Sequence, residues 1–594
     1  MYQPPLKELR FVLHDLIGEG RLSELPGFAE YSTDFADAAL EEAGKFAQEV
    51  LDPINRVGDA EGARWTPDGV VMPKVFKDAY KAFVDGGWPT LRAAQAQGGQ
   101  GAPTVLGTAV EELWGSSNLA FKLCPMLTQG AIEALERCGS AEQKHKYLPK
   151  MVSGEWTGTM NLTEPHAGSD LGVIRTRAVP EGNHYRLYGQ KIFITYGDQD
   201  YTPNVIHMVL GRIEGAPTGT KGISLFIVPK VMVNDDGSLG ERNDVRCVSI
   251  EHKLGIHASP TCVMSYGDQK GAVGYLVGEA NRGLQYMFIM MNAARLAVGL
   301  EGWAIAERAY QQAVEWSRTR VQGRPPVPKG MTTDKPLPIA YHADIKRMLL
   351  TMKSHADAGR AIGLYAAFQL DLAKQERDEP RRAAAQARAD VLIPIVKGWS
   401  TEIGVLVASL GVQVHGGMGF IEETGAAQYL RDSRITTIYE GTTGIQAGDL
   451  IGRKVGRDGG EAMSAFIDEM TAELQAIKSS DAGVQSSVKA ALEGIGLLRD
   501  ATAALLQYWS ADSERAQAIA VPYLMLSGYA IGGWLLAKSH DIAVRKQADD
   551  PDFYAAKAQI ARFYAGQVLP NTLALARIVS GGTDSVLAAD PAVM

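Results

Sequence analysis

The spacing of apolar residues changes twice along this chain, and no other feature of the sequence limits the fold so strongly. Before about residue 155, and again from Gly283 onward, apolar residues recur every three or four positions, which is typical of amphipathic helices. Between these regions, short apolar or alternating runs are separated by turn-rich segments, which is typical of strands. This order predicts helices, then a compact β-sandwich or barrel of about 120 residues, then helices again.

The pattern also predicts the individual helices of the first region and the individual strands of the middle region. In the first region, which is expected to be α-helical, helical spacing covers 32–51, 74–85, 104–119 and 131–138, with a glycine-rich loop at 98–101. In the middle region, the predicted strands cover 184–195, 205–210, 223–228, 245–250, 262–266 and 273–277.

The third region predicts long helices. One covers 286–318, and a second carries the apolar stripe Ile345, Met348, Leu349, Met352 and Ala356. A third covers 384–410, and Pro394 is expected to kink or divide it. After a glycine-rich linker at 456–460, helical spacing continues almost to the end. We therefore expect an α+β fold with domains at 1–154 (helical), 155–280 (β), 281–455 (helical bundle) and 456–594 (appended, helical).

Composition excludes several classes of protein. With 46% hydrophobic and 21% charged residues, the chain is an ordinary globular protein, and its net charge of -9 argues against nucleic acid as the main partner. Its 4 cysteines contain no CxxC pair, which disfavours a disulfide scaffold or a metal site and favours a reducing cytoplasm. The amino terminus lacks the pattern of a secretory signal, so we expect a cytoplasmic protein.

Residues 518–537 carry no charge, and this stretch is about 20 residues long, the length that spans a bilayer. It contains a proline, three glycines and several alanines among charged helical segments. A buried helix or helix pair is the preferred interpretation, and a membrane-spanning or membrane-surface role is the alternative.

The segment 431–446, RDSRITTIYEGTTGIQ, contains a single carboxylate, Glu440, between Tyr439 and Gly441. Because glycine carries no side chain, the backbone there can approach a ligand closely. Neighbours such as Ile438 and Tyr439 would partly desolvate the carboxylate, and desolvation raises the pKa of a carboxyl group and makes it a stronger base. The simpler alternative is a surface glutamate at the end of a helix or strand.

Three other motifs could bind a ligand. Residues 160–170 (MNLTEPHAGSD) follow a strand and offer hydroxyls and backbone amides, or are a polar turn. In 191–195 (KIFIT), Phe193 and Thr195 share one face of a strand, which could line a flat ring or belong to the core. In 413–420 (QVHGGMGF), the glycines permit close backbone approach, and His415 is more simply structural than catalytic.

Arg295 lies in an apolar helical stretch, where a buried guanidinium needs either an acidic partner such as Glu301 or an anionic ligand. The chain has no GxGxxG after a strand, no GxxxxGK[ST] and no GxSxG. A Rossmann nicotinamide site, a P-loop and a nucleophile elbow are therefore disfavoured.

These motifs, in this order, resemble the acyl-CoA dehydrogenase family over about residues 35–455. The helical region after 455 is similar to that of the larger members, such as those acting on 3-methylmercaptopropionyl-CoA and their long-chain relatives. The resemblance implies a four-helix C-terminal bundle and a flavoenzyme that oxidises an acyl-CoA thioester to a trans-2-enoyl-CoA. It implies that Glu440 takes the α-proton while its backbone amide polarises the thioester carbonyl. In some members the base lies at the position of Ala294, which cannot act.

The resemblance also implies the binding residues. Those implied to contact FAD are Met160, Leu162, Thr163, Gly168, Ser169, Phe193, Ile194, Thr195, Arg320, Gln413, Gly416, Gly417, Thr442 and Gly444. Those implied to contact the acyl-CoA are Ser169, Asn292, Arg295, Tyr439 and Gly441. Arg320 would reach the FAD pyrophosphate of the neighbouring subunit.

The sequence departs from the family pattern at several of these positions. Phe193 stands where tryptophan is usual, Asn292 where aspartate is frequent, and Gly444 where glutamine is frequent. After Arg320 the sequence reads VQGR, one residue shorter than the usual pattern and without its phenylalanine. These departures affect contacts to the adenine, the CoA and the FAD.

The implied electron acceptor is an electron-transferring flavoprotein, and the implied assembly is a homodimer, in which the appended domain would occupy the second dimer interface of smaller relatives. Two alternatives stay open. One is an acyl-CoA oxidase, which passes electrons to O₂. The other is a non-catalytic, flavin-containing protein of the same fold that binds nucleic acid, which the acidic net charge and the presence of Glu440 disfavour.

Overall fold

The computed structural model describes residues 2–18, 20–29, 31–327, 331 and 334–593, apart from the side chains of Met290 and Asn292. The chain forms two compact units, which we describe one at a time. Unit 1 contains Lys45–Ala102 and Ser117–Ala297, and unit 2 contains Tyr2–Gly44, Pro103–Ser116 and Val298–Met594.

Unit 1 begins with helices. They are η3 (Ala47–Leu51), α4 (Asp52–Glu61), α5 (Lys74–Asp85), α7 (Leu119–Cys138) and α8 (Ala141–Val152), with one-turn helices η4 (Trp88–Thr90), η5 (Gln95–Gln97), η6 (Leu171–Val173) and η7 (Thr220–Gly222). The Asn118 side chain caps α7 by accepting a hydrogen bond from Phe121 N at 3.1 Å. A capping box formed by Ser140 and Gln143 begins α8. These capping side chains explain why the helices begin where they do.

The first region is not entirely helical, so that expectation was wrong in one place. Strands β1 (Arg64–Thr66) and β2 (Gly69–Val71) form an antiparallel hairpin between α4 and α5. The intervening Pro67 and Asp68, followed by Gly69 at a positive φ of 135°, supply the turn. The Asp198 carboxylate accepts a hydrogen bond from Val70 N at 3.2 Å, which ties the hairpin to the β region.

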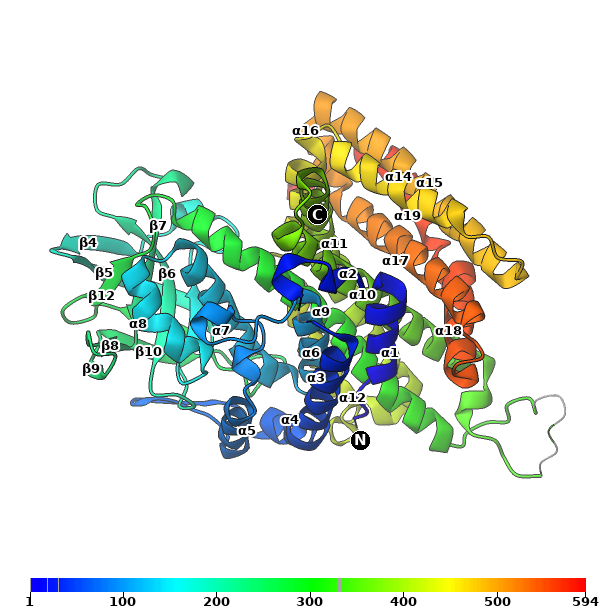
Figure 1. The fold of residues 1–594 in the computed structure, drawn as a ribbon, viewed down its shortest axis with the longest axis horizontal. Helices are drawn as coiled ribbons and strands as arrows, with labels where there is room; N and C mark the ends of the chain where they lie inside the picture. The colour runs from blue at the N-terminus through cyan, green and yellow to red at the C-terminus, as the bar shows by residue number, and fades with distance from the viewer. Residues whose placement is uncertain (1, 19, 30, 328–330, 332–333, 594) are drawn as a thin grey trace. The chain divides into compact units, whose positions relative to one another are not determined.

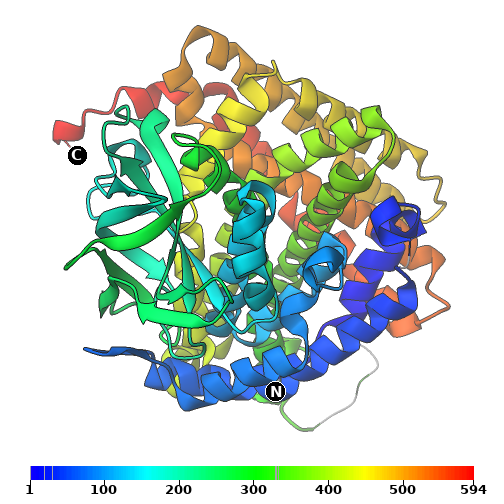
Figure 2. The ribbon, with the colours of Figure 1, turned by 60° about the vertical axis from the view of Figure 1, so that its left-hand side comes forward.

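A closed β-barrel forms the centre of unit 1 (Figures 1 and 2). Strand β5 (His184–Thr195) pairs with β12 (Ala272–Leu276), which pairs with β7 (Ile223–Pro229) and then β6 (Val205–Ile213). Strand β4 (Arg177–Glu181) closes the ring, because it pairs with both β5 and β6. Strands β3 (Thr157–Asn161), β11 (Thr261–Tyr266) and β10 (Val245–Ile250) extend the sheet, while β8 (Val231–Val233) and β9 (Leu239–Arg242) form a separate hairpin.

Small and large apolar side chains alternate across the barrel interior. Ala178 and Ala272 are both register partners of Leu187, and all three are fully buried. Every residue of β7 is buried, which explains why its sequence is apolar apart from Ser224 instead of alternating. Each of the six predicted strands is present, within three residues of its expected ends.

Unit 2 is helical. Its N-terminal helices are α1 (Leu6–Arg10), η1 (Phe11–Ile17), α2 (Gly20–Ser23), η2 (Pro26–Phe28) and most of α3 (Thr33–Phe46), and α6 (Thr104–Ser117) follows later in the chain. The helices of 298–456 are the second part of α9 (Gly283–Thr319), η8 (Ile339–Tyr341), α10 (Ala343–Gln375), α11 (Glu379–His415), η9 (Gly416–Phe420), η10 (Glu422–Thr424), α12 (Ala426–Ser433), η11 (Arg434–Thr437), α13 (Thr443–Asp449) and η12 (Leu450–Gly456).

The appended region continues unit 2. It contains α14 (Glu461–Ala476), α15 (Ala482–Ala511), α16 (Ser513–Ala518), α17 (Ala520–Arg545), α18 (Pro551–Phe563), η13 (Tyr564–Val568), α19 (Asn571–Gly581), α20 (Thr583–Leu587) and η14 (Pro591–Val593). Helices α14, α15, α17 and α19 lie side by side (Figure 1, yellow to orange-red). The predicted order of helices, β domain, helical bundle and appended helices is confirmed.

Pro394 does not divide its helix. Helix α11 continues from Glu379 to His415, and α10, α13, α14 and α17 pack along it. Residues 391–401 of α11 are all buried, so packing on every side outweighs the loss of one backbone donor.

The uncharged stretch at 518–537 is a buried helix, in agreement with the preferred interpretation of the sequence. It forms most of α17, where Leu524, Ile531 and Trp534 are fully buried. In the described part of the chain, two helical stretches, Glu379–Phe420 and Ala520–Arg545, have the length and composition needed to cross a membrane, and 83% of each apolar window is buried inside the protein. Such burial is typical of core helices.

A network of seven ionic side chains, all buried except the half-buried Glu8, connects the helices of unit 2. The cations are Lys353 and Arg360 of α10 and Lys557 of α18, and the anions are Glu8 of α1, Glu112 of α6, Glu307 of α9 and Asp357 of α10. Arg360 donates to Glu112 at 2.6 Å, Glu307 at 2.9 Å and Asp357 at 3.1 Å. Lys557 donates to Glu8 at 2.7 Å and Asp357 at 2.8 Å.

This ion network can stabilise unit 2 only while all its members are present, because a buried charge without its partner is costly. Burial by itself would raise the pKa of Glu307, but the nearby Lys353 and Arg360 outweigh it and lower that pKa to about 2. The carboxylates of the network therefore tie the N-terminal helix α1 and the appended helix α18 to the same point of α10.

Candidate active site

In unit 1, the loop after β3 is shaped by a buried carboxylate. Glu164, in the segment 163–170, accepts hydrogen bonds from Arg175 N at 2.6 Å, Thr176 N at 3.0 Å and Thr176 Oγ1 at 2.6 Å. It also pairs with Lys191 Nζ of β5 at 2.9 Å, and both side chains are almost fully buried. We call this Glu164–Lys191 pair the loop clamp.

The loop clamp also fixes the backbone that precedes the loop. Lys191 Nζ donates a second hydrogen bond to Leu162 O at 3.0 Å, and Ile192 N donates to Thr163 O at 2.9 Å. Burial alone would raise the pKa of Glu164, but the Lys191 ammonium group and the hydrogen bonds from Arg175 and Thr176 outweigh it, so this pKa lies below its usual value. The loop is therefore held on β5 by an ionised carboxylate.

The clamped loop presents small and polar groups at the surface of unit 1. Gly168 and Ser169 are exposed, Leu162 and Thr163 are half-buried, and Met160 is buried. A Cβ placed on Gly168 would meet no heavy atom within 4 Å, so a ligand has space to approach the backbone there.

Beside this loop, β5 ends in an irregular turn. Phe193 has a positive φ of 60°, and its side chain is 58% exposed, an unusual environment for a large apolar ring. Ile194 is buried and Thr195 half-buried. The positive φ of Phe193 falls where the pairing of β5 with β11 shifts register, so the shared face of Phe193 and Thr195 stays a prediction. Thr159 Oγ1 donates to Thr195 O at 2.7 Å and holds the end of the strand.

Helix α9 carries the predicted CoA-contacting residues in its unit 1 part. Arg295 is buried, with 4% of its surface exposed, and Ala294 beside it is also buried. The side chain of Asn292 lies outside the described residues. Lys122 of α7 donates to Ala297 O at 2.7 Å, which fixes this part of α9 on the helices of unit 1.

In unit 2, Glu440 lies on a left-handed turn. Its φ is 53° and that of Gly441 is 90°, so two consecutive residues occupy the region that favours glycine. The Glu440 side chain is half-buried. Lys397 Nζ of α11 donates to Gly441 O at 2.7 Å, and Gln446 Nε2 of α13 donates to Glu440 O at 3.0 Å and Gly441 O at 3.3 Å.

The residues on either side of this turn are also held. Tyr439 donates its hydroxyl to the buried Glu301 of α9. Burial and the neighbouring Glu301 carboxylate raise the pKa of Tyr439, so the phenol stays protonated. Thr443 Oγ1 donates to Glu402 Oε1 of α11 at 2.6 Å, and the exposed Thr442 caps α13 by accepting from Ile445 N.

The other predicted FAD contacts of unit 2 are exposed. They are Arg320, which lies next to the Trp316 ring at 5.9 Å, together with Gln413, Gly416, Gly417 and Gly444. A Cβ on Gly416 or Gly417 would meet no heavy atom within 4 Å. Their backbones are therefore open to a ligand or to another subunit.

His415 is structural, as the simpler interpretation predicted. It is buried, its Nδ1 donates to Gly411 O at 2.7 Å, and its ring stacks on Trp316 with centroids 5.2 Å apart. Burial lowers its pKa, which keeps the imidazole neutral.

Sequence reasoning missed the residues that hold the ligand-facing segments. Glu164 and Lys191 are 27 positions apart, and Lys397 precedes Gly441 by 44. One signal was readable: a lysine inside a strongly apolar stretch, such as Lys397 in 391–399, must find a polar partner.

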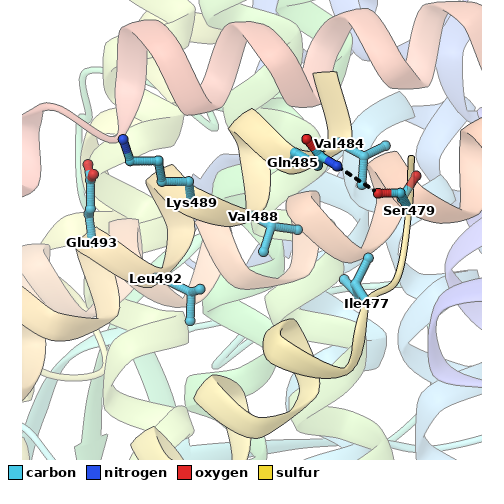
Figure 3. A pocket seen from close by; sticks show the side chains of 8 residues that line it. All are labelled: Ile477, Ser479, Val484, Gln485, Val488, Lys489, Leu492 and Glu493. Carbon is cyan, nitrogen blue, oxygen red and sulfur yellow. Dashed lines mark hydrogen bonds between the residues drawn. The ribbon is translucent and has the colours of Figure 1, made fainter. Parts of the chain in front are cut away.

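A separate groove of about 510 Å³ lies on the appended helices, formed by α15 and the segment before it (Figure 3). Apolar side chains form most of its wall, Lys489 and Glu493 stand at one end, and Gln485 donates to Ser479 O at 3.1 Å. The lining residues are Ile477, Ser479, Val484, Gln485, Val488, Lys489, Leu492 and Glu493, which include none of the predicted site residues.

Family models match almost the whole chain. The N-terminal, middle and C-terminal domains of acyl-CoA dehydrogenase match residues 33–155, 159–268 and 281–455, and an acetyl-CoA dehydrogenase C-terminal-like model matches 463–590. The chain is 46% identical, over 591 residues and 99% of each chain, to the 3-methylmercaptopropionyl-CoA dehydrogenase of Ruegeria pomeroyi. This chain belongs to the acyl-CoA dehydrogenase family.

Two further relatives support this assignment. The broad-specificity linear acyl-CoA dehydrogenase FadE5 of Mycobacterium tuberculosis is 32% identical over 618 residues, covering 100% of this chain and 99% of the relative. An acyl-CoA dehydrogenase from Bacillus anthracis, solved with FAD, shares the fold with a TM-score of 0.71 at 20% identity, covering 97% and 92%. The predicted family, with its extra C-terminal helical region, is confirmed, and the protein is an acyl-CoA dehydrogenase with FAD as its cofactor.

The residues present fit FAD. In unit 1, the exposed Phe193 ring can line a flat heterocycle, while Thr163, Ser169 and the open backbone at Gly168 offer hydrogen-bonding groups to it. In unit 2, the exposed Arg320 guanidinium suits a pyrophosphate, and the open backbone at Gly416 and Gly417 suits a ligand approached closely.

Proposed function

We propose that this protein is an FAD-dependent dehydrogenase of 3-methylmercaptopropionyl-CoA, with Glu440 as its base. The observation that carries the proposal is the 46% identity, over the full length of both chains, to the Ruegeria pomeroyi enzyme of that name. Medium- and long-chain acyl-CoA esters are the alternative substrates, which the 32% identity to the broad-specificity mycobacterial enzyme favours.

In this proposal, each ligand-facing residue has a defined role. The Glu440 carboxylate removes a proton from the α-carbon of the thioester and retains it on the carboxyl group, while the backbone amide of Glu440 donates to the thioester carbonyl. The chemistry that FAD supplies when bound is acceptance of the β-hydrogen and its electron pair. Arg295, buried on α9, binds the CoA moiety together with Ser169 and Asn292, and Tyr439 and Gly441 contact the substrate.

The environment of Glu440 supports this role. An α-proton next to a thioester is weakly acidic, so base and carbonyl polarisation must act together. Glu440 is half-buried, and its left-handed backbone is held by hydrogen bonds from Lys397 and Gln446. A fixed carboxylate that water only partly solvates suits the base, and in this proposal the backbone amide of the same fixed turn polarises the carbonyl.

The acceptor of the electrons is proposed to be an electron-transferring flavoprotein, as the family resemblance implies. We also propose a homodimer in the cytoplasm. Arg320, Gln413, Gly416 and Gly417 are exposed, which supports a role for them in contacts to FAD or to a second subunit.

The substrate is tested by anaerobic bleaching of the flavin with a panel of esters. Among 3-methylmercaptopropionyl-, butyryl-, octanoyl- and palmitoyl-CoA, the methylthio ester should give the highest kcat/KM. A linear ester that reacts about tenfold better than the methylthio ester would move the assignment to linear acyl-CoA esters.

The role of Glu440 is tested with Glu440→Gln, which should bind FAD and substrate but lose bleaching by about 10³-fold or more. Glu461→Gln, at an exposed residue in the first turn of α14, is the control and should bleach at the wild-type rate. Bleaching retained in Glu440→Gln would remove Glu440 from its role.

The acceptor is tested by stopped-flow reoxidation of the substrate-reduced enzyme. A dehydrogenase should be reoxidised by electron-transferring flavoprotein and only slowly by air. Reoxidation by air at the turnover rate would make the protein an oxidase. Salt-sensitive DNA binding without any bleaching would favour the non-catalytic alternative.

A further inference from the structure

We propose that Lys397 is a positioning residue for the base. Its buried ammonium group holds the Glu440–Gly441 segment in the left-handed turn from which the Glu440 carboxylate acts. This inference rests on the proposed role of Glu440, and it concerns a residue that the sequence motifs did not identify.

The geometry of the turn requires external support. Glutamate has a Cβ, and a φ of 53° is a backbone conformation that such residues rarely adopt unless their surroundings enforce it. The following Gly441 has a φ of 90°, a conformation in which any side chain is strained, and a Cβ there would come within 2.7 Å of Gln446 Nε2. The turn is therefore tightly packed against the residue that also donates to it.

Lys397 supplies that support from the middle of α11. Its side chain is fully buried, and its Nζ donates to Gly441 O at 2.7 Å, a charge-assisted hydrogen bond that fixes the direction of the carbonyl. Gln446 donates to the same carbonyl and to that of Glu440. Because both carbonyl groups are directed toward α11 and α13, the peptide planes on either side of Gly441 have one orientation.

Helix α11 contacts the segment at a second point. Glu402, five residues after Lys397, accepts the hydrogen bond from Thr443 Oγ1 at 2.6 Å. Two side chains of one rigid helix thus fix positions 441 and 443, and the base at 440 immediately precedes them. A buried ammonium group is a costly way to fill a helix interface, where an apolar side chain would pack equally well. The hydrogen bond that this ammonium group donates imposes a direction on the turn, which an apolar side chain could not do.

Loss of Lys397 should therefore displace the Glu440 carboxylate while FAD and the ester still bind. A displacement of about 1 Å at a reacting group can lower its rate about 10²-fold. Most of the residues proposed to bind the cofactor and the ester lie outside this turn, so both affinities should change much less than the rate of proton removal. This separation distinguishes a positioning residue from one that only stabilises the fold.

The test uses an ester that the base can attack but that cannot be dehydrogenated. 3,3-Dimethylbutyryl-CoA has two α-hydrogens and no β-hydrogen, so the base can exchange its α-hydrogens for deuterium from D₂O, whereas no electrons leave the ester. The exchange rate of the FAD-loaded enzyme, measured by mass spectrometry, reports on removal of the α-proton and not on transfer of electrons. FAD content and the dissociation constant of the ester are measured on the same samples.

Lys397→Met keeps the length of the side chain and removes the donor. We expect exchange to fall about 10²-fold, with FAD content unchanged and the dissociation constant within about threefold of wild type. The matched control is Lys557→Met, which removes an equally buried lysine of unit 2 from the ion network. It should lower stability but leave exchange unchanged.

A second variant keeps the inference testable if Lys397→Met folds poorly. Gln446→Leu removes the other donor to the Gly441 carbonyl, and it should slow exchange about tenfold. Because both side chains act on one carbonyl, the double variant should lose less than the product of the two single effects. Exchange within threefold of wild type in Lys397→Met or Gln446→Leu, or strictly multiplicative effects, would overturn the inference.

Failure of the proposed function would look different. In that case the wild-type protein would exchange no α-hydrogen, or Glu440→Gln would exchange as fast as wild type. If instead exchange depends on Glu440 and not on Lys397, the role of Glu440 as the base is supported and only its positioning by Lys397 is wrong.

Discussion

The two ligand-facing segments are held by buried charges of opposite sign. In unit 1, the Glu164 carboxylate collects backbone and side-chain donors from around the loop, and Lys191 pairs with it. In unit 2, the Lys397 ammonium group donates to a carbonyl of the turn. A carboxylate can gather several N–H groups around one point, whereas an ammonium group fixes the direction of a carbonyl.

This difference corresponds to what each segment presents. The loop at 163–170 presents small and polar groups over several residues, so it needs its whole backbone held in shape. The turn at 439–444 presents one reactive carboxylate, so it needs the orientation of a single peptide segment to be fixed. Substitutions in each segment separate these two modes of support.

The largest effect is expected when the loop clamp is broken. Lys191→Met leaves Glu164 buried without its cation, which should destabilise unit 1 by about 3 kcal/mol or more and lower FAD content. FAD fluorescence on heating measures the temperature of cofactor release, which should fall. Lys74→Met, in an exposed pair with Asp78, is the control and should release FAD at the wild-type temperature. Equal release temperatures in both variants would contradict the clamp.

Acidification should lower the stability that the ionised Glu164 gives to the same loop. This effect should be smaller than that of Lys191→Met. The pKa of Glu164 is lower in the folded protein than in the unfolded chain, so its contribution to stability is fully present above about pH 4.3 and is lost as the pH falls through the folded pKa. FAD release measured from pH 7 downward should show this loss below about pH 4.3. In Glu164→Gln that part of the pH dependence should disappear, and its persistence would assign it to other carboxyl groups.

A smaller effect is expected beside the base. Tyr439→Phe removes the hydroxyl that donates to the buried Glu301, and unit 2 should lose about 1.5–3 kcal/mol. Denaturant unfolding followed by circular dichroism measures this loss. The control Tyr508→Phe, whose hydroxyl donates to a neutral carbonyl at an exposed site, should cost less than about 1 kcal/mol. Equal losses would mean that the hydrogen bond to Glu301 stabilises the protein no more than the exposed hydrogen bond of Tyr508 does.

The smallest effect is expected at Thr443. Thr443→Val keeps the shape of the side chain and removes its hydrogen bond to Glu402, so stability should fall by about 1 kcal/mol. The exchange assay with 3,3-dimethylbutyryl-CoA should change much less than in Lys397→Met, since the Gly441 carbonyl keeps both of its donors. If Thr443→Val lost as much exchange as Lys397→Met, the start of α13 and not Lys397 would be what positions the base.

Much of the fold could be predicted from the period of apolar residues, because burial of one face imposes that period. Barrel closure could not, since β4 is short and partly exposed and its pairing with both β5 and β6 depends on three-dimensional register. The hairpin of β1 and β2 has a sequence signal, the Pro67–Asp68–Gly69 turn, which lies between two short helical stretches.

The candidate site likewise contains residues that could be predicted from the sequence and residues that could not. Motif residues such as Glu440, Gly168 and Phe193 could be named from the sequence, because they lie in short segments with recognisable composition. Their supports could not, because Lys397 and Lys191 reach their partners only after a helix and a strand have packed. The positive φ of Phe193 likewise depends on the irregular pairing of β5 with β11.

The ion network has a consequence for any attempt to shorten this protein. Lys557 belongs to the appended helices, yet it neutralises Glu8 and Asp357, which lie in the earlier part of the chain. A truncation after Val455 would remove Lys557 and leave four carboxylates of the network facing two cations. A minimal enzyme made from this sequence would therefore need Glu8 or Asp357 redesigned to a neutral side chain before it could stand without its last helices.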